Sequence, residues 1–393
     1  MSSVPPCPVC AAGTGSIFFE LGSQPVLIGL LWEEAGAARS CRKGDISLAF
    51  CPECGFVWNT RFDPGLLDYD QRYDNSLHFS PTFQAYTETL VARLTETYAL
   101  QGKTIVDIGC GKGDFLALLC AAGANRGYGF DPSFEGERPS GPGFERVVWS
   151  NSYYSEEHAK LQADLLTSRF VFEHIPDPIA FLRMIHRSIP DPSRTAIYFE
   201  VPNIDLIVRQ GSVWDIIYEH CSYFAPASLA RAFTESGFDV LRTDEPYQQQ
   251  FLSIEARANP AGAGSSPGTG ENLAQLRAQV RSFAQGQQQK RETWRERLQQ
   301  WQQEGRSVAI WGGGAKAVGF LNMLQDRSVI RQVIDINPFK RGKFLPGTGQ
   351  RIVSPEDLAA DPPDTVVLMN PIYRSEVEQS LARMGMGPVL FEA

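Results

Sequence analysis

The chain has 393 residues, of which 43% are hydrophobic and 11% aromatic, so it is long enough for two or three domains with their own cores. Its formal net charge of −9 and the absence of a basic run exclude a typical nucleic-acid partner, whose phosphates need cations. With no apolar run of about 18–20 residues and no signal-sequence pattern, we expect no membrane partner and a cytoplasmic, reducing location without disulfides.

Two cysteine pairs near the N-terminus have the spacing of metal-binding knuckles. Cys7-Pro-Val-Cys10 and Cys51-Pro-Glu-Cys54 each place two thiolates on one tight turn. Two such turns complete a tetrahedral zinc site, and four thiolates leave no position for water. The pattern therefore predicts a structural Zn²⁺ in a zinc-binding domain of residues 1-70. The alternative is two unrelated cysteine pairs. Cys41 lies between the knuckles and is interpreted as a bystander.

The next informative segment is a buried strand followed by a glycine turn. Residues 104–108 form the apolar strand, and an apolar helix follows the turn. Three glycines allow the backbone to turn sharply and approach a ligand: Gly109, Gly111 and Gly113. Asp107 at the end of the strand would repel a pyrophosphate but suits an ammonium or sulfonium group. Asp131, after a second strand, can accept hydrogen bonds from both hydroxyls of a ribose.

This loop resembles the first motif of class I S-adenosylmethionine-dependent methyltransferases. The resemblance implies S-adenosylmethionine as cofactor, whereas an ordinary glycine-rich turn would leave Asp131 unexplained. From about residue 71 to 258, strand and helix patterns alternate, as in a parallel sheet covered on both faces. We therefore predict a methyltransferase domain over 71-258 with a Rossmann-like α/β sheet, and expect its later strands at 163–172, 196–201, 238–241 and 251–256.

Two segments follow strands of this predicted sheet and carry reactive side chains. Ligands of open α/β sheets bind beyond the carboxyl ends of the strands, which places Arg169, Glu173 and His174 beside a bound cofactor. The alternative is that His174 only packs against or caps the following helix. After the fifth strand, a phenol, a carboxylate and an imidazole are consecutive: Tyr218, Glu219 and His220. Histidine is well suited to take a proton near neutral pH, and the alternative is a surface helix start.

The last third of the sequence predicts a linker, a long helix and a second nucleotide-type fold. Residues 259-304 combine a flexible Gly/Ser/Pro linker with a Gln- and Arg-rich stretch that has apolar residues at helical spacing. Residues 305-393 predict a C-terminal Rossmann-like α/β domain with strands near 307–311, 333–335 and 365–369. Its Gly312–Ala317 loop and Asp335 match a dinucleotide fingerprint, so an NAD(P)-dependent oxidoreductase is a rival interpretation. Lys316 at the helix start suits a phosphate-bearing ligand.

Taken together, the motifs resemble the three-domain sugar C-methyltransferases of deoxysugar biosynthesis over nearly the whole chain. That family joins a four-cysteine zinc domain, a methyltransferase domain and a C-terminal Rossmann-like domain. Beyond the cysteine pairs and the glycine loop, several stretches carry the resemblance: Tyr69 and Tyr73 before Ser76, Glu173-His174, Glu200-Val-Pro-Asn203, Glu219-His220 with Ser222-Tyr-Phe224, Gly314-Ala-Lys316, Asp335-x-Asn-Pro338 and Leu345-Pro-Gly-Thr348.

The resemblance implies a mechanism and an acceptor. A base removes the proton beside a keto group, and the resulting enolate takes the methyl group. His220 would be the base and Glu219 would orient it, while Tyr73 and Tyr218 would hold the substrate or enolate oxygen. The acceptor would be a small molecule, a nucleotide-linked keto sugar or related metabolite. Three further residues are then expected to bind substrate: Lys316, Asn203 and Tyr223. The family's C-terminal domain is not known for hydride transfer, which weakens the oxidoreductase interpretation.

Two departures from the family pattern lie on the acceptor side. The family typically has Tyr-His-Glu-His where this chain has Tyr218-Glu219-His220, so Tyr218 is not securely equivalent to the family tyrosine. A family Gly-Gly-Ser loop is replaced by residues 247–253. O- or N-methylation of another small natural-product intermediate therefore stays open, as does a non-catalytic cofactor-binding role. The sequence leaves the oligomeric state and the stereochemistry open.

Overall fold

The chain builds its N-terminal part around a four-stranded antiparallel sheet. The computed structural model describes residues 4–134, 141–262, 264–266, 268, 273–324 and 328–393. The first sheet has the order β1 (Ser16–Pro25), β2 (Lys43–Phe50), β3 (Val57–Asn59), β9 (Ser222–Tyr223). The short helix α1 (Ala35–Arg39) lies between β1 and β2 in the chain. Because β9 comes from the predicted methyltransferase segment, residues 1-70 do not complete this sheet alone.

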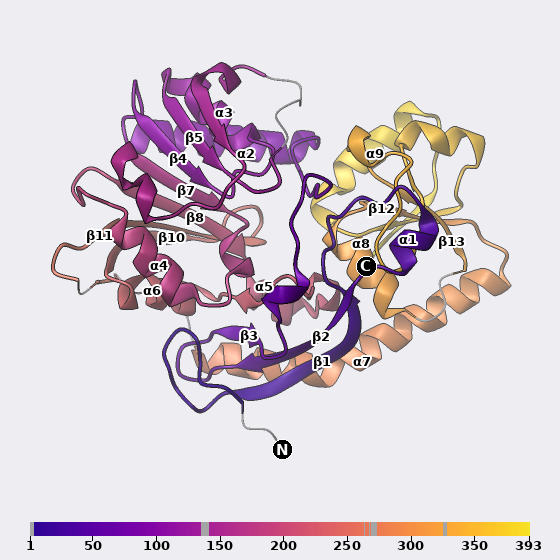
Figure 1. The fold of residues 1–393 in the computed structure, drawn as a ribbon. Helices are drawn as coiled ribbons and strands as arrows, with labels where there is room; N and C mark the ends of the chain where they lie inside the picture. Colours follow the sequence, from indigo (N-terminus) through magenta and orange to yellow (C-terminus); the bar gives the residue numbers. More distant parts are fainter. Residues whose placement is uncertain (1–3, 135–140, 263, 267, 269–272, 325–327) are drawn as a thin grey trace.

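The middle third of the chain builds a seven-stranded sheet (the central sheet), on the left in Figure 1. Its order is β10 (Phe238–Asp244), β11 (Phe251–Ala258), β8 (Ala196–Pro202), β7 (Leu165–Arg169), β4 (Thr104–Ile108), β5 (Arg126–Phe130), β6 (Val147–Ser150). The strands run parallel except β11, which pairs antiparallel with both neighbours. We did not locate β6 from the sequence, because it is a four-residue edge strand without a buried side chain.

Helices cover both faces of the central sheet because its strands bury alternate side chains on opposite sides. On one face Ile105 packs with α2 (Pro81–Thr97) and α3 (Asp114–Gly123). On the other face Val106 packs with α4 (Pro178–Arg187) and α6 (Pro226–Glu235). The two cysteine turns join this second core through Cys7, Cys51 and Cys54. The cysteine turns are therefore built into the central domain.

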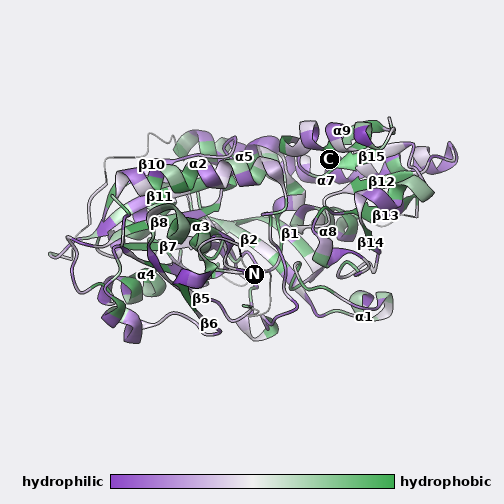
Figure 2. Ribbon diagram, turned by 90° about the horizontal axis from the view of Figure 1, so that it is seen from above, coloured by the Kyte–Doolittle hydropathy of each residue, from purple (hydrophilic) through white to green (hydrophobic). Residues whose placement is uncertain are grey.

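The third sheet is parallel and lies beside the central one (Figure 1). Its order is β14 (Ile352–Val353), β13 (Ile330–Ile334), β12 (Val308–Trp311), β15 (Thr365–Leu368), β16 (Val389–Glu392), and its helices are α8 (Ala315–Met323) and α9 (Arg374–Arg383). We missed β14 and β16, whose strands are only two and four residues long. Figure 2 shows hydrophobic residues along the strands and hydrophilic stretches on the outer helix surfaces.

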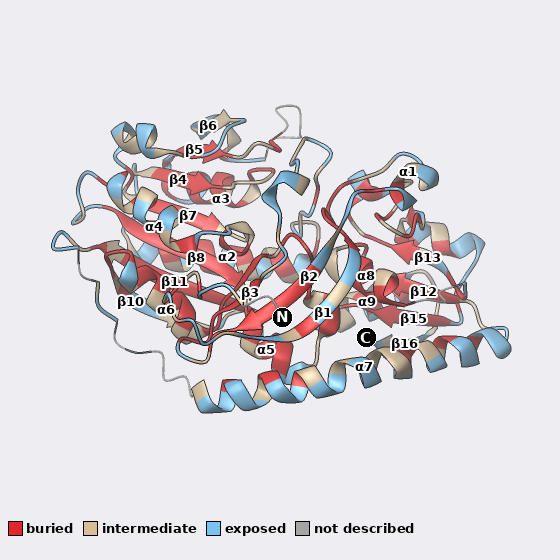
Figure 3. Ribbon diagram, turned by 60° about the horizontal axis from the view of Figure 1, so that its bottom comes forward, coloured by how far each residue is buried: buried red, intermediate tan, exposed pale blue. Residues whose placement is uncertain are grey.

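One long helix connects all three parts. Helix α7 (Leu273–Gln303) runs beneath the first and third sheets, and its outward face is exposed along its length (Figure 3). Leu276 and Phe283 of α7 belong to one continuous core with the first sheet, α5 (Ile204–Gln210) and the third domain. The predicted helix start at Glu271 and part of the linker lie outside the described residues. Within the described ranges, no helix is long and apolar enough to cross a membrane.

Candidate active site

A cavity of about 1090 Å³ lies between the central and third domains. The carboxyl ends of β4, β5 and β7 open into it from one side, and the loop after β12 opens from the other. Parallel strands leave their carboxyl ends at one edge of a sheet, where ligands of such folds bind. The cavity therefore joins the two glycine loops that the sequence analysis kept apart.

The glycine loop after β4 has the backbone that its sequence predicts. Gly109, Gly111 and Gly113 all have positive φ, at +70°, +54° and +92°. A Cβ at Gly109 would come within 2.2 Å of Val171 Cγ2, so only glycine fits there. A Cβ at Gly111 would instead meet nothing within 4 Å. The loop thus presents bare backbone to the cavity, leaving room for a ligand.

Two carboxylates flank this loop. Thr167 donates a hydrogen bond of 2.6 Å to Asp107, and burial raises the pKa of Asp107 to about 7 although Thr167 lowers it. Asp131 accepts from the Gly111 amide at 2.8 Å and from the Ser133 amide at 2.7 Å, so it fixes the loop while facing the cavity. Carboxylates beside an open glycine backbone fit a ligand with ammonium, sulfonium and ribose hydroxyl groups.

Arg169 lies at the end of β7 on the same side of the cavity. Its Nε donates to Glu200 at 2.7 Å, and Tyr86 donates to the other oxygen of Glu200, also at 2.7 Å. The guanidinium lies 4.4 Å from the ring centroid of Phe115, at the start of α3. Its Nη2 is buried and has no hydrogen-bond partner among the described residues. Arg169 is therefore fixed in place, and its Nη2 is left to bind an anionic group of a ligand.

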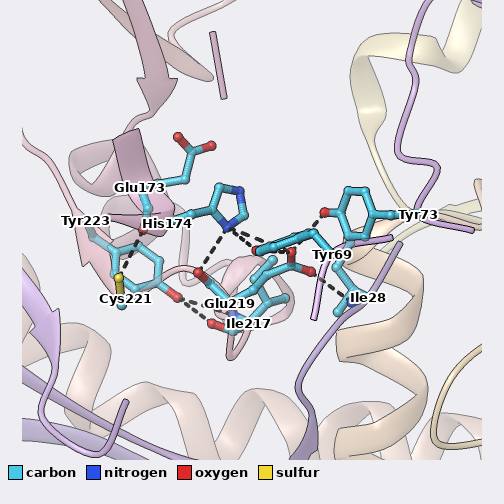
Figure 4. A network of polar contacts seen from close by, with 9 residues as sticks. All are labelled: Ile28, Tyr69, Tyr73, Glu173, His174, Ile217, Glu219, Cys221 and Tyr223. Carbon is cyan, nitrogen blue, oxygen red and sulfur yellow. Dashed lines mark hydrogen bonds and ion pairs between the residues drawn. The ribbon is translucent and has the colours of Figure 1, made fainter. Parts of the chain in front are cut away.

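Glu219 is the centre of a polar network that reaches the N-terminal segment (Figure 4). One carboxylate oxygen accepts from the Ile28 amide at 2.8 Å. The other accepts from the hydroxyls of Tyr69 at 3.1 Å and Tyr73 at 2.9 Å. Burial raises the pKa of Glu219 to about 7, opposed by these hydrogen bonds. The hydrogen bonds of both Glu219 oxygens go to the N-terminal segment, and Oε2 also lies 3.7 Å from His174 Nδ1. The orientation of His220 by Glu219 stays a prediction.

Two histidines lie between this network and the cavity. His174 Nδ1 lies 3.0 Å from the Glu219 carbonyl oxygen, and burial lowers the pKa of His174 to about 4. The His220 ring meets the His174 ring edge to face, with centroids 5.0 Å apart. Burial and then the charge of His174 lower the pKa of His220 well below its ordinary value. Its Nδ1 is buried without a partner among the described residues, so His220 is a neutral imidazole with an unused ring nitrogen.

Besides Glu219, three predicted site residues lie outside the cavity lining. Tyr218 packs against Phe62, and its hydroxyl accepts a 2.9 Å bond from the Asp63 amide. The Tyr223 hydroxyl bonds to the backbone of Ile217. Asn203 caps α5 and donates to Glu245 and the Gln249 carbonyl. These side chains hold local structure, because each makes its polar contacts within the surrounding backbone and loops rather than toward the cavity.

The third domain lines the cavity with paired cations. Lys316, at the start of α8, forms a 2.6 Å ion pair with Asp215. Asp335, the acid of the dinucleotide fingerprint, accepts from the Gly313 amide at 2.9 Å and lies 3.2 Å from the Lys340 ammonium. Because Lys340 occupies this carboxylate in a buried ion pair, the acid is not free for ribose hydroxyls. The geometry weakens the dinucleotide interpretation.

The four cysteines of the two knuckles come together. The Sγ atoms of Cys7 and Cys54 are 3.6 Å apart, those of Cys10 and Cys51 are 3.5 Å apart, and all four ligand atoms lie within 4.8 Å of one another. A zinc ion with Zn–S bonds of about 2.3 Å would place its ligands roughly 3.8 Å apart. The cluster therefore fits a tetrahedral four-thiolate site.

Several residues of the site escaped the sequence analysis. Tyr69 was noted only as part of the resemblance, yet it bridges His174 Nδ1 and Glu219. Asp215 and Lys340 were not identified because their partners, Lys316 and Asp335, come from other elements. A weak signal existed for Lys340, since it follows Asp335 by five residues. Long-range pairs such as Asp215–Lys316 leave no comparable trace in a single sequence.

The seven-stranded sheet with one reversed strand, the open glycine loop and the two loop carboxylates define a class I S-adenosylmethionine-dependent methyltransferase. Residues 83–243 match the family described as "Methyltransferase domain", and residues 270–388 match the "C-methyltransferase C-terminal domain". The "C-methyltransferase NovU" of Streptomyces niveus is 27% identical over 391 residues, covering 94% of this chain and 90% of that protein. The chain therefore resembles a methyltransferase domain followed by a C-methyltransferase C-terminal domain.

Solved structures resemble part of the chain. A magnesium protoporphyrin IX methyltransferase from Synechocystis, with S-adenosylhomocysteine bound, has 18% identity and a TM-score of 0.34, covering 45% of this chain and 84% of that chain. A methyltransferase from Aquifex aeolicus has 15% identity and a TM-score of 0.34, covering 45% of this chain and 93% of that one.

Proposed function

We propose that this enzyme methylates a carbon atom beside a carbonyl group of a small molecule, and that His220 is the base. The observation that carries the proposal is the position of His220: its ring lines the cavity that also holds the cofactor loop, and its buried Nδ1 has no partner among the described residues. A neutral imidazole with a free nitrogen can accept a proton from carbon.

The cofactor side of the cavity suits S-adenosylmethionine. The residues that would hold it are the loop glycines, Asp107 near its positive groups, Asp131 at the ribose, and Arg169 at its carboxylate. When bound, S-adenosylmethionine supplies an activated methyl group for a carbon nucleophile. The protein's contribution is to position the acceptor carbon and to exclude water, and positioning alone can account for a large share of the rate enhancement.

The acceptor side supports a proton transfer. His220 takes the proton adjacent to the carbonyl and becomes an imidazolium ion. The Glu219 carboxylate, held by Tyr69, Tyr73 and the Ile28 amide, lies 3.7 Å from Nδ1 of His174, the ring that packs against His220. Tyr73 lines the cavity, so it can also contact the substrate. Tyr218 is not part of this mechanism because its hydroxyl lies against Asp63.

We further propose a nucleotide-linked keto sugar as the acceptor class. Support comes from the third domain, where Gly312, Gly314 and Lys316 line the same cavity at the start of α8. Backbone amides at a helix start and a lysine suit phosphate groups. Asp215 neutralises part of the Lys316 charge, but Lys290 of α7 also lines the cavity close to this pair. A related small metabolite with an acidic anchor would use the same groups.

The test is the position of the transferred methyl group. Enzyme, ¹³C-methyl-labelled S-adenosylmethionine and a panel of nucleoside-diphosphate keto sugars are incubated, and the product is analysed by NMR. A label coupled to a sugar carbon supports the proposal, and a label on oxygen or nitrogen contradicts it. In D₂O the wild-type enzyme should exchange the adjacent proton of the acceptor, and His220→Asn should abolish exchange. Exchange that persists in His220→Asn would remove His220 from its role as base.

We also propose that the four-cysteine cluster holds a structural zinc ion. The close approach of the four sulfur atoms supports it, since all lie within 4.8 Å of one another, and Cys7, Cys51 and Cys54 are buried in the second core of the central sheet. Metal analysis of the purified protein should give one zinc per chain. The Cys54→Ser variant should lose the metal and unfold at lower temperature, because zinc binding energy contributes to folding. A fully stable, metal-free wild-type protein would contradict this assignment.

A further inference from the structure

Glu173 carries hydrogen-bonding capacity that the proposed mechanism leaves unused. It lies in the short 3₁₀ turn η4 (Phe172–His174), is 2% exposed, and lines the cavity. Its Oε2 is buried and has no hydrogen-bond partner among the described residues. A carboxylate oxygen of Glu173 and one ring nitrogen each of His174 and His220 lie within 4.8 Å of one another. In Figure 4 the Glu173 carboxylate points away from the network of His174, Tyr69 and Glu219.

The donors of the neighbouring network are already engaged. Tyr69 and Tyr73 both donate to Glu219. His174 directs Nδ1 to the Glu219 carbonyl oxygen, so its other ring nitrogen carries a lone pair when the ring is neutral. His220 must also present a lone pair if it is the base. Arg169 has a free donor but lies on the cofactor side, against Phe115. A carbonyl oxygen beside His220 therefore needs another donor.

The surroundings of Glu173 favour its protonated form. Burial, followed by the Glu219 and Glu200 carboxylates, raises the pKa of Glu173 to about 8, although a backbone hydrogen bond lowers it. The other titratable groups that face it are the phenol of Tyr73, the thiol of Cys221 and the two histidines. The pKa of Tyr73 and that of Cys221 are raised by burial, and those of both histidines are lowered by it. At neutral pH these four groups are uncharged.

We propose that Glu173, as a protonated carboxylic acid, donates a hydrogen bond to the carbonyl oxygen of the acceptor while His220 removes the adjacent proton. This inference rests on the proposed function and deepens it. The electron pair of the broken C–H bond forms a carbon–carbon double bond, and the carbonyl π pair moves to oxygen, where Oε2–H of Glu173 stabilises the charge. The proton resides on His220. When the carbon bonds to the methyl group, the methyl–sulfur bond breaks with its pair on sulfur and the carbonyl re-forms. His220 then releases its proton to water.

This role moves Glu173 from the cofactor side, where the sequence analysis placed it, to the acceptor side. The two assignments differ in what they predict for ligand binding. A cofactor residue should weaken S-adenosylhomocysteine binding when it is replaced. An oxyanion donor should leave that affinity unchanged and should lower kcat, because its contact is strongest in the transition state.

The experiment compares Glu173→Gln, which keeps a neutral donor, with Glu173→Ala, which removes it. The acceptor is a nucleoside-diphosphate keto sugar that the wild-type enzyme methylates, and S-adenosylhomocysteine binding is measured by calorimetry. We expect Glu173→Gln to stay within about tenfold of wild-type kcat, and Glu173→Ala to lose about 10²- to 10³-fold. Both should keep wild-type affinity for S-adenosylhomocysteine. Glu235→Gln on the exposed surface of α6 is the matched control and should match wild type.

The pH profile separates this role from a purely structural one. Wild-type kcat should fall as pH rises through about 8, because ionised Glu173 cannot donate. Glu173→Gln should lack this alkaline decline. A Gln variant as inactive as the Ala variant, or an unchanged alkaline decline in Glu173→Gln, would overturn the proposal because the carboxylate would then act ionised. The proposal would also be overturned if the wild-type protein bound a divalent ion in addition to that of the cysteine cluster and Glu173→Gln lost that ion.

The outcomes also separate this proposal from the proposed function. If Glu173→Ala keeps full activity and the label still enters a carbon with His220 required, the Glu173 role fails and carbon methylation stands. If the label enters oxygen or nitrogen in the wild-type enzyme, the proposed function fails first, and the donor role of Glu173 fails with it.

Discussion

The two glycine loops of this chain start from nearly the same sequence pattern and end in different chemistry. Each follows a parallel strand, opens a helix and faces an acid at the end of the next strand. Asp131 holds its own loop through amides and still faces the cavity. Asp335 holds its loop too, but it is buried and paired with the Lys340 ammonium. A strand followed by a glycine loop and an acid therefore identifies a fold. Which ligand the loop can bind depends on whether the acid is free or paired with a cation.

The largest expected effect tests the buried pair of the second loop. Lys340→Ala leaves Asp335 charged and buried without its cation, so we expect the free energy of unfolding to fall by about 3–5 kcal/mol. Urea denaturation followed by circular dichroism measures it. The control Asp335→Asn/Lys340→Met removes both charges and keeps an acceptor for the Gly313 amide, and should recover most of the loss. A stable Lys340→Ala protein would mean that the two acids are less different than the geometry indicates.

The next effect concerns the first loop. Asp131→Ala removes the carboxylate that would accept hydrogen bonds from both ribose hydroxyls of the cofactor, and it also removes the acceptor of the Gly111 amide. We therefore expect S-adenosylhomocysteine to bind more weakly by roughly 2–3 kcal/mol, or about 30- to 150-fold. Calorimetric titration gives the dissociation constant. The matched change in the second loop is Gly314→Ala, where a Cβ meets nothing closer than 3.7 Å, and it should leave this affinity unchanged. Equal losses in both variants would place the cofactor across both loops.

The smallest effect is a pH dependence of cofactor binding. Burial raises the pKa of Asp107 to about 7, so its negative charge appears as pH rises through 7. Affinity for the ammonium-bearing S-adenosylhomocysteine should therefore increase by about tenfold from pH 6 to pH 8. Asp107→Asn should remove this dependence. The free energy of unfolding depends on pH in the opposite direction. Because the raised pKa favours the protonated acid in the folded state, the contribution of Asp107 to stability is complete below pH about 4 and is lost as pH rises through 7.

Much of the fold was accessible from the sequence because its signals are local. Apolar strands, the positive-φ glycines and the cysteine knuckles each carry their information within a few residues, and these expectations agree with the sheets and the cysteine cluster. The edge strands β6, β14 and β16 were missed because they are short and two of them bury no side chain.

The candidate site was less accessible because its contacts join distant segments. Consecutive residues 218–220 suggested one constellation, but Tyr218 turns to Asp63, Glu219 to Ile28 and the tyrosines, and only His220 reaches the cavity. The exposure pattern of residues 218–220 cannot reveal that loops of the N-terminal segment will hydrogen-bond to Glu219. Likewise Lys340 neutralises Asp335 only because a 3₁₀ turn folds back over the loop.

The measurement that tests the comparison most directly is a pair of calorimetric titrations on the wild-type protein, one with S-adenosylhomocysteine and one with oxidised and reduced nicotinamide dinucleotides. We predict one S-adenosylhomocysteine site per chain that Asp131→Ala weakens and Gly314→Ala does not, with no binding of either nicotinamide form. Tight binding of a nicotinamide dinucleotide that Gly314→Ala abolishes, without binding of S-adenosylhomocysteine, would contradict the account.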